Sequence, residues 1–301
     1  MVLLSHYTTR AGLEGIAKTK TFWATNFLSL NDTSEFFYGW HQLIKTALEM
    51  AMGLIPDEKK PAGYDKGTLI ENATSQFKES FHSTDGYGHL YVTSFARAKT
   101  EDHNERGIRT LWELYNSHKG YCLQFEEEDV RRMLELDSQT SNYEWRGMAE
   151  VKYGIDRGEQ DFRKLCFQLS QQFLLQVIRA RADIRVELQW EQMWPDSVLH
   201  RKIMEFCATH KDPCYEDERE LRIFVYPSAS AEFRVFTGIA TKKQVKTCPN
   251  GKKYIALGEN WRPGIMPRRV IIGTKADQNI DSILANYFPK PKVASANMPI
   301  A

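Results

Sequence analysis

Strand-like and helix-like patterns occupy different parts of this 301-residue chain. Runs typical of strands lie at 2–7, 21–25, 89–95 and 120–125, and again at 220–226, 233–236, 254–257 and 269–272. Between the two groups, apolar residues at helical spacing predict long helices over 160–181 and 197–209. Because helices and strands do not alternate regularly, a doubly wound parallel sheet is disfavoured. We therefore expect an α+β fold in which helices flank a mixed or antiparallel sheet.

Two polar motifs predict where the N-terminal helices begin. Thr8 or Thr9 can cap a helix whose apolar face comprises Ala11, Leu13, Ile16 and Ala17. Asp32 and Glu35 fit a capping box, which predicts a helix that runs to about Met52. Further helices are expected at 69–81, 109–116, 130–136 and 280–288.

No repeat and no obvious linker divides the chain. We expect a single domain over residues 1–288, with a helical insertion at about 126–210. The highly charged segment 96–108 is expected to be a mobile loop. Residues 289–301 contain three prolines, and we expect them to form a flexible tail.

The charge balance does not predict a strongly basic protein. Lys and Arg number 40 against 39 for Asp and Glu, so the formal net charge is +1. A dedicated duplex-DNA binder usually has a basic excess, although a local basic groove is compatible with this average. Five cysteines, an odd number in a long chain, do not predict a disulfide framework. The chain lacks a signal-peptide pattern and any run of ~18 apolar residues, so we expect a cytoplasmic protein without a membrane segment.

An acidic cluster that runs directly into a predicted strand is the first candidate site. Alternate residues of a strand face the same side, so Glu218, Glu220 and Arg222 would share one face. The intervening apolar residues, such as Leu221, would face the core. The charged side chains either form a solvated ion pair, worth under about 1 kcal/mol, or line a cleft. In the second case Arg222 would hold one carboxylate and the other would face a ligand.

Other candidate residues have simple structural explanations. His6 ends the first predicted strand, where a histidine often only donates a hydrogen bond to a nearby carbonyl, and Thr8 is an ordinary helix cap. The acidic residues Glu216, Asp217, Glu218 and Glu220 could instead be ligands of a metal-dependent nuclease or hydrolase. Zinc-like spacing without a clear fourth ligand occurs at Cys207, His210 and Cys214. We expect no bound metal.

Several motifs together resemble known families. The His-x-Thr of residues 6–8 and the Glu-x-Glu of residues 218–220 resemble the motifs that mark the first and a late core strand of the ADP-ribosyltransferase superfamily. Over about residues 3–275 the chain also resembles a large bacterial family of unassigned function. The motifs of that second resemblance are His6–Thr8, Leu30–Asp32, Ser94–Phe95, Trp112–Tyr115, Gly120–Cys122 and Glu218–Arg222.

The resemblance implies an ADP-ribosyltransferase-like fold, with a split mixed or antiparallel sheet, and NAD as the substrate. It implies that Glu220 stabilises the oxocarbenium-like sugar that forms as nicotinamide leaves, and that Glu218 orients or deprotonates the acceptor. His6 would donate to a ribose hydroxyl. The other implied NAD contacts are Tyr7, Thr8, Ser94, Phe95, Tyr115 and Arg222, with Tyr91, Phe95 and Tyr115 as alternatives for the ring that stacks on nicotinamide, and Thr93–Ser94 as a serine-type alternative.

The implied acceptor is a macromolecule, either a protein or a single-stranded nucleic acid. By analogy alone, the role would be that of a bacterial toxin or a phage-defence effector. Two other functions stay open, namely a non-catalytic module that binds a nucleotide or a partner, and the metal-dependent nuclease. The enzymatic interpretation requires His6 and Glu220 to meet across one pocket.

Overall fold

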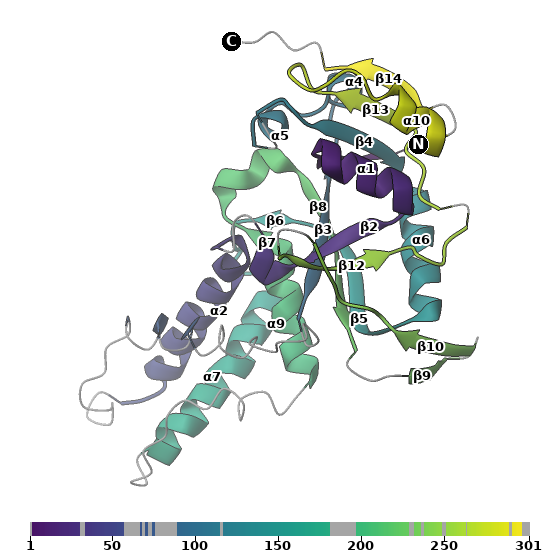
Figure 1. The fold of residues 1–301 in the computed structure, drawn as a ribbon. Helices are drawn as coiled ribbons and strands as arrows, with labels where there is room; N and C mark the ends of the chain where they lie inside the picture. Colours follow the sequence, from purple (N-terminus) through teal and green to yellow (C-terminus); the bar gives the residue numbers. More distant parts are fainter. Residues whose placement is uncertain are drawn as a thin grey trace. The chain divides into compact units, whose positions relative to one another are not determined.

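The computed structural model describes residues 2–30, 34–56, 67, 70, 71, 74, 75, 89–114, 117–180, 197–228, 232–235, 238–248, 251–262, 264–288 and 291–296. These residues form an α+β protein, as expected, with a mixed parallel and antiparallel sheet flanked by helices (Figure 1). The chain divides into two compact units. The sheet unit comprises residues 1–30, 86–151 and 214–301, and the helical unit comprises residues 31–85 and 152–213.

The sheet unit contains the strands of the large sheet. In chain order they are β1 (Leu3–Thr8), β2 (Phe22–Asn26), β3 (Tyr91–Arg97), β4 (Tyr121–Glu126), β5 (Ser141–Glu150), β8 (Glu220–Pro227), β9 (Glu232–Val235), β10 (Gly238–Lys242), β11 (Lys246–Thr247), β12 (Lys253–Leu257), β13 (Arg269–Ile272) and β14 (Lys292–Ser295). Its helices are α1 (Arg10–Thr19), α4 (Glu101–Arg106), α5 (Arg109–Leu114), α6 (Glu127–Thr140) and α10 (Asp281–Tyr287), with a 3-10 turn, η1 (Phe27–Ser29). A second 3-10 segment, η3 (Pro213–Glu218), leads into β8.

The helical unit is built from α2 (Ser34–Gly53), α7 (Gln160–Ala180) and α9 (Ser197–Thr209). A short parallel pair, β6 (Lys152–Tyr153) with β7 (His210–Lys211), joins its later segments. Gly39 in α2 lies so close to α9 that an added Cβ would be 3.1 Å from the Cα of Cys207. Glycine inside a helix costs roughly 1 kcal/mol relative to alanine, and here it permits the close approach of the two helices.

Strand β3 is the branch point of the large sheet. The strand order is β14-β13-β4-β1-β3-β8-β5-β10-β9, and β2, β12 and β11 continue as a branch from β3. Along one edge β3 pairs with β8 from Tyr91 to Ala96. Along the other edge it pairs with β1 at Ala96 and Arg97, and with β2 at Tyr91 and Val92. The sheet therefore splits along this edge, between β1 and β2.

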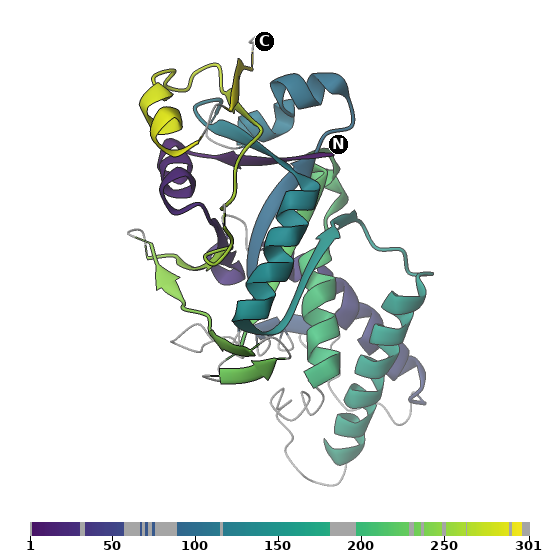
Figure 2. The same cartoon turned by 90° about the vertical axis from the view of Figure 1, so that its right-hand side faces the viewer.

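The register also defines two faces of the sheet, because opposed residues of antiparallel strands point to the same side. The first face carries Leu4, Phe95 and Leu221, and belongs to the main apolar core with residues of α1, α6 and α10. Helix α6 lies along this sheet, against β4, β5, β10 and β12 (Figure 2). A smaller apolar cluster covers part of the second face and comprises Tyr7, Ala96, Ile108, Leu111, Trp112, Cys122, Ile271 and Ala296.

Helix α1 begins where its sequence predicts. The side chain of Thr9 accepts a hydrogen bond from the backbone N–H of Gly12 at 3.2 Å, which satisfies one of the first unpaired donors of the helix. Lys20 follows the helix with a φ of 58° and donates its N–H to the carbonyl of Ile16. The cap at Thr9 is confirmed. Of the predicted apolar face, Leu13, Ile16 and Ala17 are buried, whereas Ala11 is exposed, so the prediction is wrong for Ala11.

Two segments expected to lack structure contain regular elements among their described residues, so the two predictions are wrong for those residues. The charged segment 96–108 completes β3 and then forms α4, whose cap Thr100 accepts from the N–H of His103 at 3.2 Å. The expected tail, 289–301, contains β14, which pairs in parallel with β13 from Lys292 to Ser295. This strand lies at the edge of the sheet.

The expected domain organisation also differs from the structure. We expected one domain with a helical insertion at 126–210. The helical unit instead consists of residues 152–213 together with residues 31–85. Strand β5 lies inside the expected insertion and pairs with β8 in the sheet unit. Of the expected helix at 69–81, residues 70, 71, 74 and 75 are described, and they are helical. The predicted capping box includes Asp32, which lies outside the described residues.

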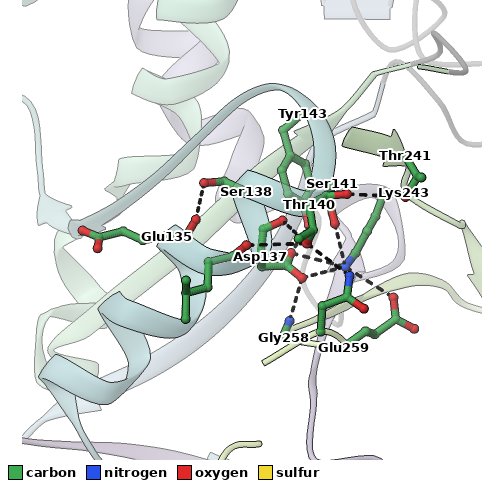
Figure 3. Close-up of polar contacts among 12 residues, drawn as sticks. Glu135, Asp137, Ser138, Thr140, Ser141, Tyr143, Thr241, Lys243, Gly258 and Glu259 are labelled. Carbon is green, nitrogen blue, oxygen red and sulfur yellow. Dashed lines mark hydrogen bonds and ion pairs between the residues drawn. The ribbon is translucent and has the colours of Figure 1, made fainter. Parts of the chain in front are cut away.

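A buried ion pair, the Asp137 cluster, fixes one end of α6 against β5 and against the residues that directly follow β10 and β12 (Figure 3). The Asp137 carboxylate accepts from Nζ of Lys243 at 2.9 and 3.2 Å, from Oη of Tyr143 at 2.5 Å and from the N–H of Gly258 at 3.0 Å. Lys243 also contacts Glu259 at 3.3 Å. Burial, followed by the charge of Asp137, raises the pKa of Tyr143 well above its usual value. The hydroxyl is therefore a proton donor to the carboxylate.

Candidate functional site

Strand register aligns one residue from each of four neighbouring strands in a row on the second face, and three of these residues are polar. Gln124 of β4 is opposite Ser5 of β1, Ser5 is opposite Ala96 of β3, and Ala96 is opposite Glu220 of β8. Gln124, Ser5 and Glu220 are all buried. Buried polar groups are usually hydrogen-bonded, yet Oε1 of Gln124 has no partner, while its Nε2 donates to the carbonyl of Asn104 at 2.8 Å. We call Gln124, Ser5 and Glu220 the polar row.

Arg222 holds Glu220 in place at the end of this row. Nε of Arg222 donates to Oε1 of Glu220 at 2.6 Å, and Nη2 donates to Oε2 at 3.0 Å. Glu220 is 7% exposed and Arg222 is 2% exposed. A bidentate pair at such burial is not the solvated ion pair that the sequence left open. The other possibility, an arginine that holds a carboxylate inside the protein, is what the side chains do.

Glu218 is also buried, at 8% exposure, but it does not belong to β8. It ends the 3-10 segment η3, and Arg219, with a φ of 49°, separates it from the strand. The carbonyl of Arg219 accepts from the N–H of Arg97, which attaches this turn to β3. The strict alternation that we expected for Glu218, Glu220 and Arg222 therefore applies only to Glu220 and Arg222.

His6 lies on the face opposite to Glu220. Its neighbour Ser5 is in the polar row, so the alternation of β1 turns His6 to the first face. There the imidazole contacts the rings of Phe22 and Phe95, with centroids 5.9 and 5.4 Å away. Its Nδ1 donates to the carbonyl of Ser94 at 2.9 Å, at the edge of β3 between β1 and β2. The strand register thus does not bring His6 and Glu220 together, and His6 instead attaches β1 to β3 at the split.

Burial among aromatic rings lowers the pKa of His6 from 6.5, and the contact with the Ser94 carbonyl raises it by less. A folded-state pKa below the unfolded one gives a contribution to stability that is present above pH ~6.5 and is lost as pH falls. We expect the free energy of unfolding, measured by urea denaturation, to fall below pH ~6.5 and to fall less in His6→Gln. The comparison with wild type isolates His6, because His200 and His210, whose pKa values burial also lowers, titrate in both proteins. Equal pH dependence of the two proteins would contradict this role.

The other expected NAD contacts are divided between the two faces. Tyr7 lies on the second face, where its Oη accepts from the N–H of Ile108 at 2.6 Å and its ring meets Trp112 edge-to-face. Thr8 is half-buried at the end of β1. Ser94 is opposite Arg222 and shares its face. Phe95, only 2% exposed, is enclosed by core rings and cannot stack on a ligand without rearrangement.

Among the alternatives for the nicotinamide ring, Tyr91 is fully buried in the core, and Tyr115 lies outside the described residues. Trp112 is core as well, because its Nε1 donates to the carbonyl of Arg106 at 2.8 Å and it has no exposed surface. No aromatic ring of the described part of the chain is thus assigned to stack on nicotinamide.

The acidic cluster does not have the arrangement of a metal site. Glu216 and Asp217 are exposed, whereas Glu218 and Glu220 are buried. Cys207 and His210 are buried in the helical unit, where His210 stacks on Phe206 at 3.8 Å between centroids. Within the described residues, no group of three His, Cys, Asp or Glu side chains could hold a metal ion.

The polar row includes two residues that sequence reasoning missed, Ser5 and Gln124. A glutamine between the apolar residues of β4 was the available signal, because a buried amide is unusual in such a strand. Comparisons with protein-family models, curated proteins and solved structures gave no match. Of the helices with described residues, none is long and apolar enough to cross a membrane.

Proposed function

We propose that this chain is an NAD-dependent ADP-ribosyltransferase, whose chemistry takes place on the second face of the sheet, at Glu218 and Glu220. The burial of two carboxylates at the start of a central strand is the observation that carries the proposal. Removing a carboxylate from water costs several kcal/mol, and perturbed buried acids gather at functional sites. The split of the sheet, on the edge of β3 that faces away from β8, supports the proposal, since the resemblance implies a split sheet.

In this proposal Glu220 faces the positive charge that develops on the ribose as the bond to nicotinamide breaks. Nicotinamide is already a cationic leaving group, so no acid has to protonate it. A carboxylate offers about four acceptor positions, so the pair with Arg222 is compatible with a further hydrogen bond from a ribose hydroxyl. Arg222 fixes the direction of the carboxylate before substrate arrives, which favours the transition state. Glu218 would orient or deprotonate the acceptor.

The interpretation from the sequence required His6 and Glu220 to meet across one pocket, but the register places them on opposite faces of the sheet. The proposal therefore rests on Glu218 and Glu220 alone and gives up the expected contact of His6 with a ribose hydroxyl. On the first face His6 cannot reach a ribose held by Glu220, and we assign it as a positioning residue that holds β1 against β3. Tyr7 and Ser94 remain candidate NAD contacts because they share the face of Glu220. The aromatic ring that would stack on the pyridinium is left unassigned.

Labelled NAD tests the proposal directly. Incubation of the full chain with NAD and a cell lysate should release nicotinamide and transfer label to a macromolecule, and a chelator should change neither result. Cleavage of nucleic acid that a chelator abolishes and that does not depend on NAD would instead indicate the metal-dependent nuclease. Absence of both nicotinamide release and label transfer would contradict the transferase.

A non-catalytic binding module is the second candidate, and the positions of His6 and Glu220 favour it. His6 and Glu220 point to opposite faces, and both oxygens of Glu220 already accept from Arg222. Such a module would bind NAD or another nucleotide without turnover. Calorimetric titration with NAD that gives saturable binding, together with no nicotinamide release over hours, would establish this alternative.

A further inference from the structure

Positive charge is concentrated in one segment of this nearly neutral chain. Residues 242–262 contain five lysines and one arginine against a single acidic residue, Glu259, whereas the whole chain has a formal net charge of +1. The segment runs from the end of β10 through β11 and β12. Glu259 is shared by Lys243 and Lys246, so one carboxylate faces two ammonium groups. The segment therefore keeps a positive field that its own acidic residue does not neutralise.

A stacked pair of aromatic rings lies on the same strands. The rings of Trp23 in β2 and Tyr254 in β12 have centroids 4.4 Å apart and an angle of 27° between their planes. Both side chains are partly exposed, whereas their neighbours along the strands, Phe22 and Ile255, are fully buried in the main core. The alternation of β2 and β12 thus turns the aromatic pair away from the core.

Lysine side chains surround this pair. Lys246 of β11 lies directly opposite Tyr254 and so points to the same side. Lys252 comes two residues before Tyr254 and is partly exposed. Lys253 is the direct neighbour of Tyr254 in β12 and points to the other side of the strand, so it is not included. Lys243 does not contribute either, because its ammonium is buried against Asp137. We call Trp23, Tyr254, Lys246 and Lys252 the aromatic–lysine patch.

We propose that the aromatic–lysine patch binds single-stranded nucleic acid, which would be the acceptor of the transferase. Ammonium groups attract the phosphate backbone without regard to sequence, and aromatic rings stack on bases that are not paired. A duplex buries its bases and would use the lysines but not the rings. The acceptor role rests on the proposed function, whereas binding itself does not require NAD.

Fluorescence anisotropy with a labelled oligothymidylate, long enough for a site of roughly 4–16 nucleotides, tests the proposal on the full chain without NAD. We expect binding to weaken roughly 20-fold between about 50 and 200 mM salt, as for about three phosphate contacts. Tyr254→Ala should weaken it roughly tenfold or more, and Tyr254→Phe, which keeps the ring, should restore it. Lys246→Glu with Lys252→Glu should weaken it at least as much.

The matched control reverses two exposed lysines of the helical unit, Lys164→Glu with Lys202→Glu, and should leave binding within about twofold, because these sites are outside the patch. Circular dichroism of each variant monitors folding. Equal losses in patch and control variants would overturn the proposal, as would equal affinity for a duplex of the same length. Binding to phosphatidylserine vesicles in place of the oligonucleotide would indicate a membrane surface and would also overturn it. Loss of nicotinamide release with oligonucleotide binding intact would reject the transferase alone.

Discussion

Glu220→Gln is expected to slow nicotinamide release from NAD roughly 100- to 1,000-fold, the loss typical when a charge-stabilising group is removed from a transition state. Glutamine has nearly the shape of glutamate, but its neutral amide cannot stabilise a positive ribose. The measurement is the rate of labelled nicotinamide release at saturating NAD. Glu216→Gln with Asp217→Asn is the matched control, because these carboxylates belong to the same segment and are exposed. The control should keep full activity.

Loss of activity in Glu220→Gln would also follow if the variant were less stable, because Glu220 is one partner of a buried ion pair with Arg222. Removing one partner of a buried ion pair destabilises a protein by roughly 3–5 kcal/mol, whereas replacing both by apolar groups is often neutral. Glu220→Gln with Arg222→Met should therefore recover much of the stability lost in Glu220→Gln but none of the activity. Recovery of nicotinamide release in the double variant would show that Glu220 has only a structural role.

Asp137→Ala is expected to destabilise the sheet unit by roughly 3–5 kcal/mol. The substitution removes the acceptor of the Tyr143 hydroxyl and of the Gly258 N–H. It also removes the nearest carboxylate from the buried ammonium of Lys243, which keeps its longer contact with Glu259. The measurement is the free energy of unfolding from urea denaturation. Asp129→Ala, on the same helix but half-buried and with only a 3.8 Å contact to Arg268, should change it by under about 0.5 kcal/mol.

The Asp137 cluster also permits a test of pairing itself. Asp137→Leu with Lys243→Met removes both charges and should be less destabilising than Asp137→Ala, because no buried ammonium is left without the carboxylate that lies nearest to it. The loss in free energy of unfolding in the double variant is compared with the sum of the losses in Asp137→Leu and Lys243→Met alone. A loss equal to that sum would mean that the two charges act independently. Such additivity is the behaviour of sites that do not interact.

Local signals predicted the elements whose side chains alternate or repeat clearly. Helix α1 has both a cap and a buried apolar face, and β8 has an uninterrupted apolar run. Helix α4 was missed because none of its residues is buried, although Thr100 was a readable cap. Strand β5 was missed because its residues do not alternate regularly between buried and exposed, and its pairing with β8 and β10 fixes it as a strand.

The candidate site was predictable only in part, for a similar reason. The sequence placed Glu220 and Arg222 on one strand face, and the bidentate pair confirms that relationship. The face of His6 depended on the pairing of Ser5 with Ala96 and of Ala96 with Glu220, which join positions far apart in the chain. A shift of one residue in either pairing would have put His6 beside Glu220. Nothing local in the sequence fixes that register.

The branch point at β3 has a consequence for the order in which backbone amides exchange with deuterated water. A slip of β3 by one residue would break its ladders with β1, β2 and β8 together, because all three fix the same seven-residue strand. Opening of the pairing with β1 alone, or with β2 alone, leaves the ladder between β3 and β8 in place. The amides of Val92 to Phe95 that face β8 should therefore be among the slowest to exchange in the sheet unit, ahead of those in β14, which has a neighbour on one side.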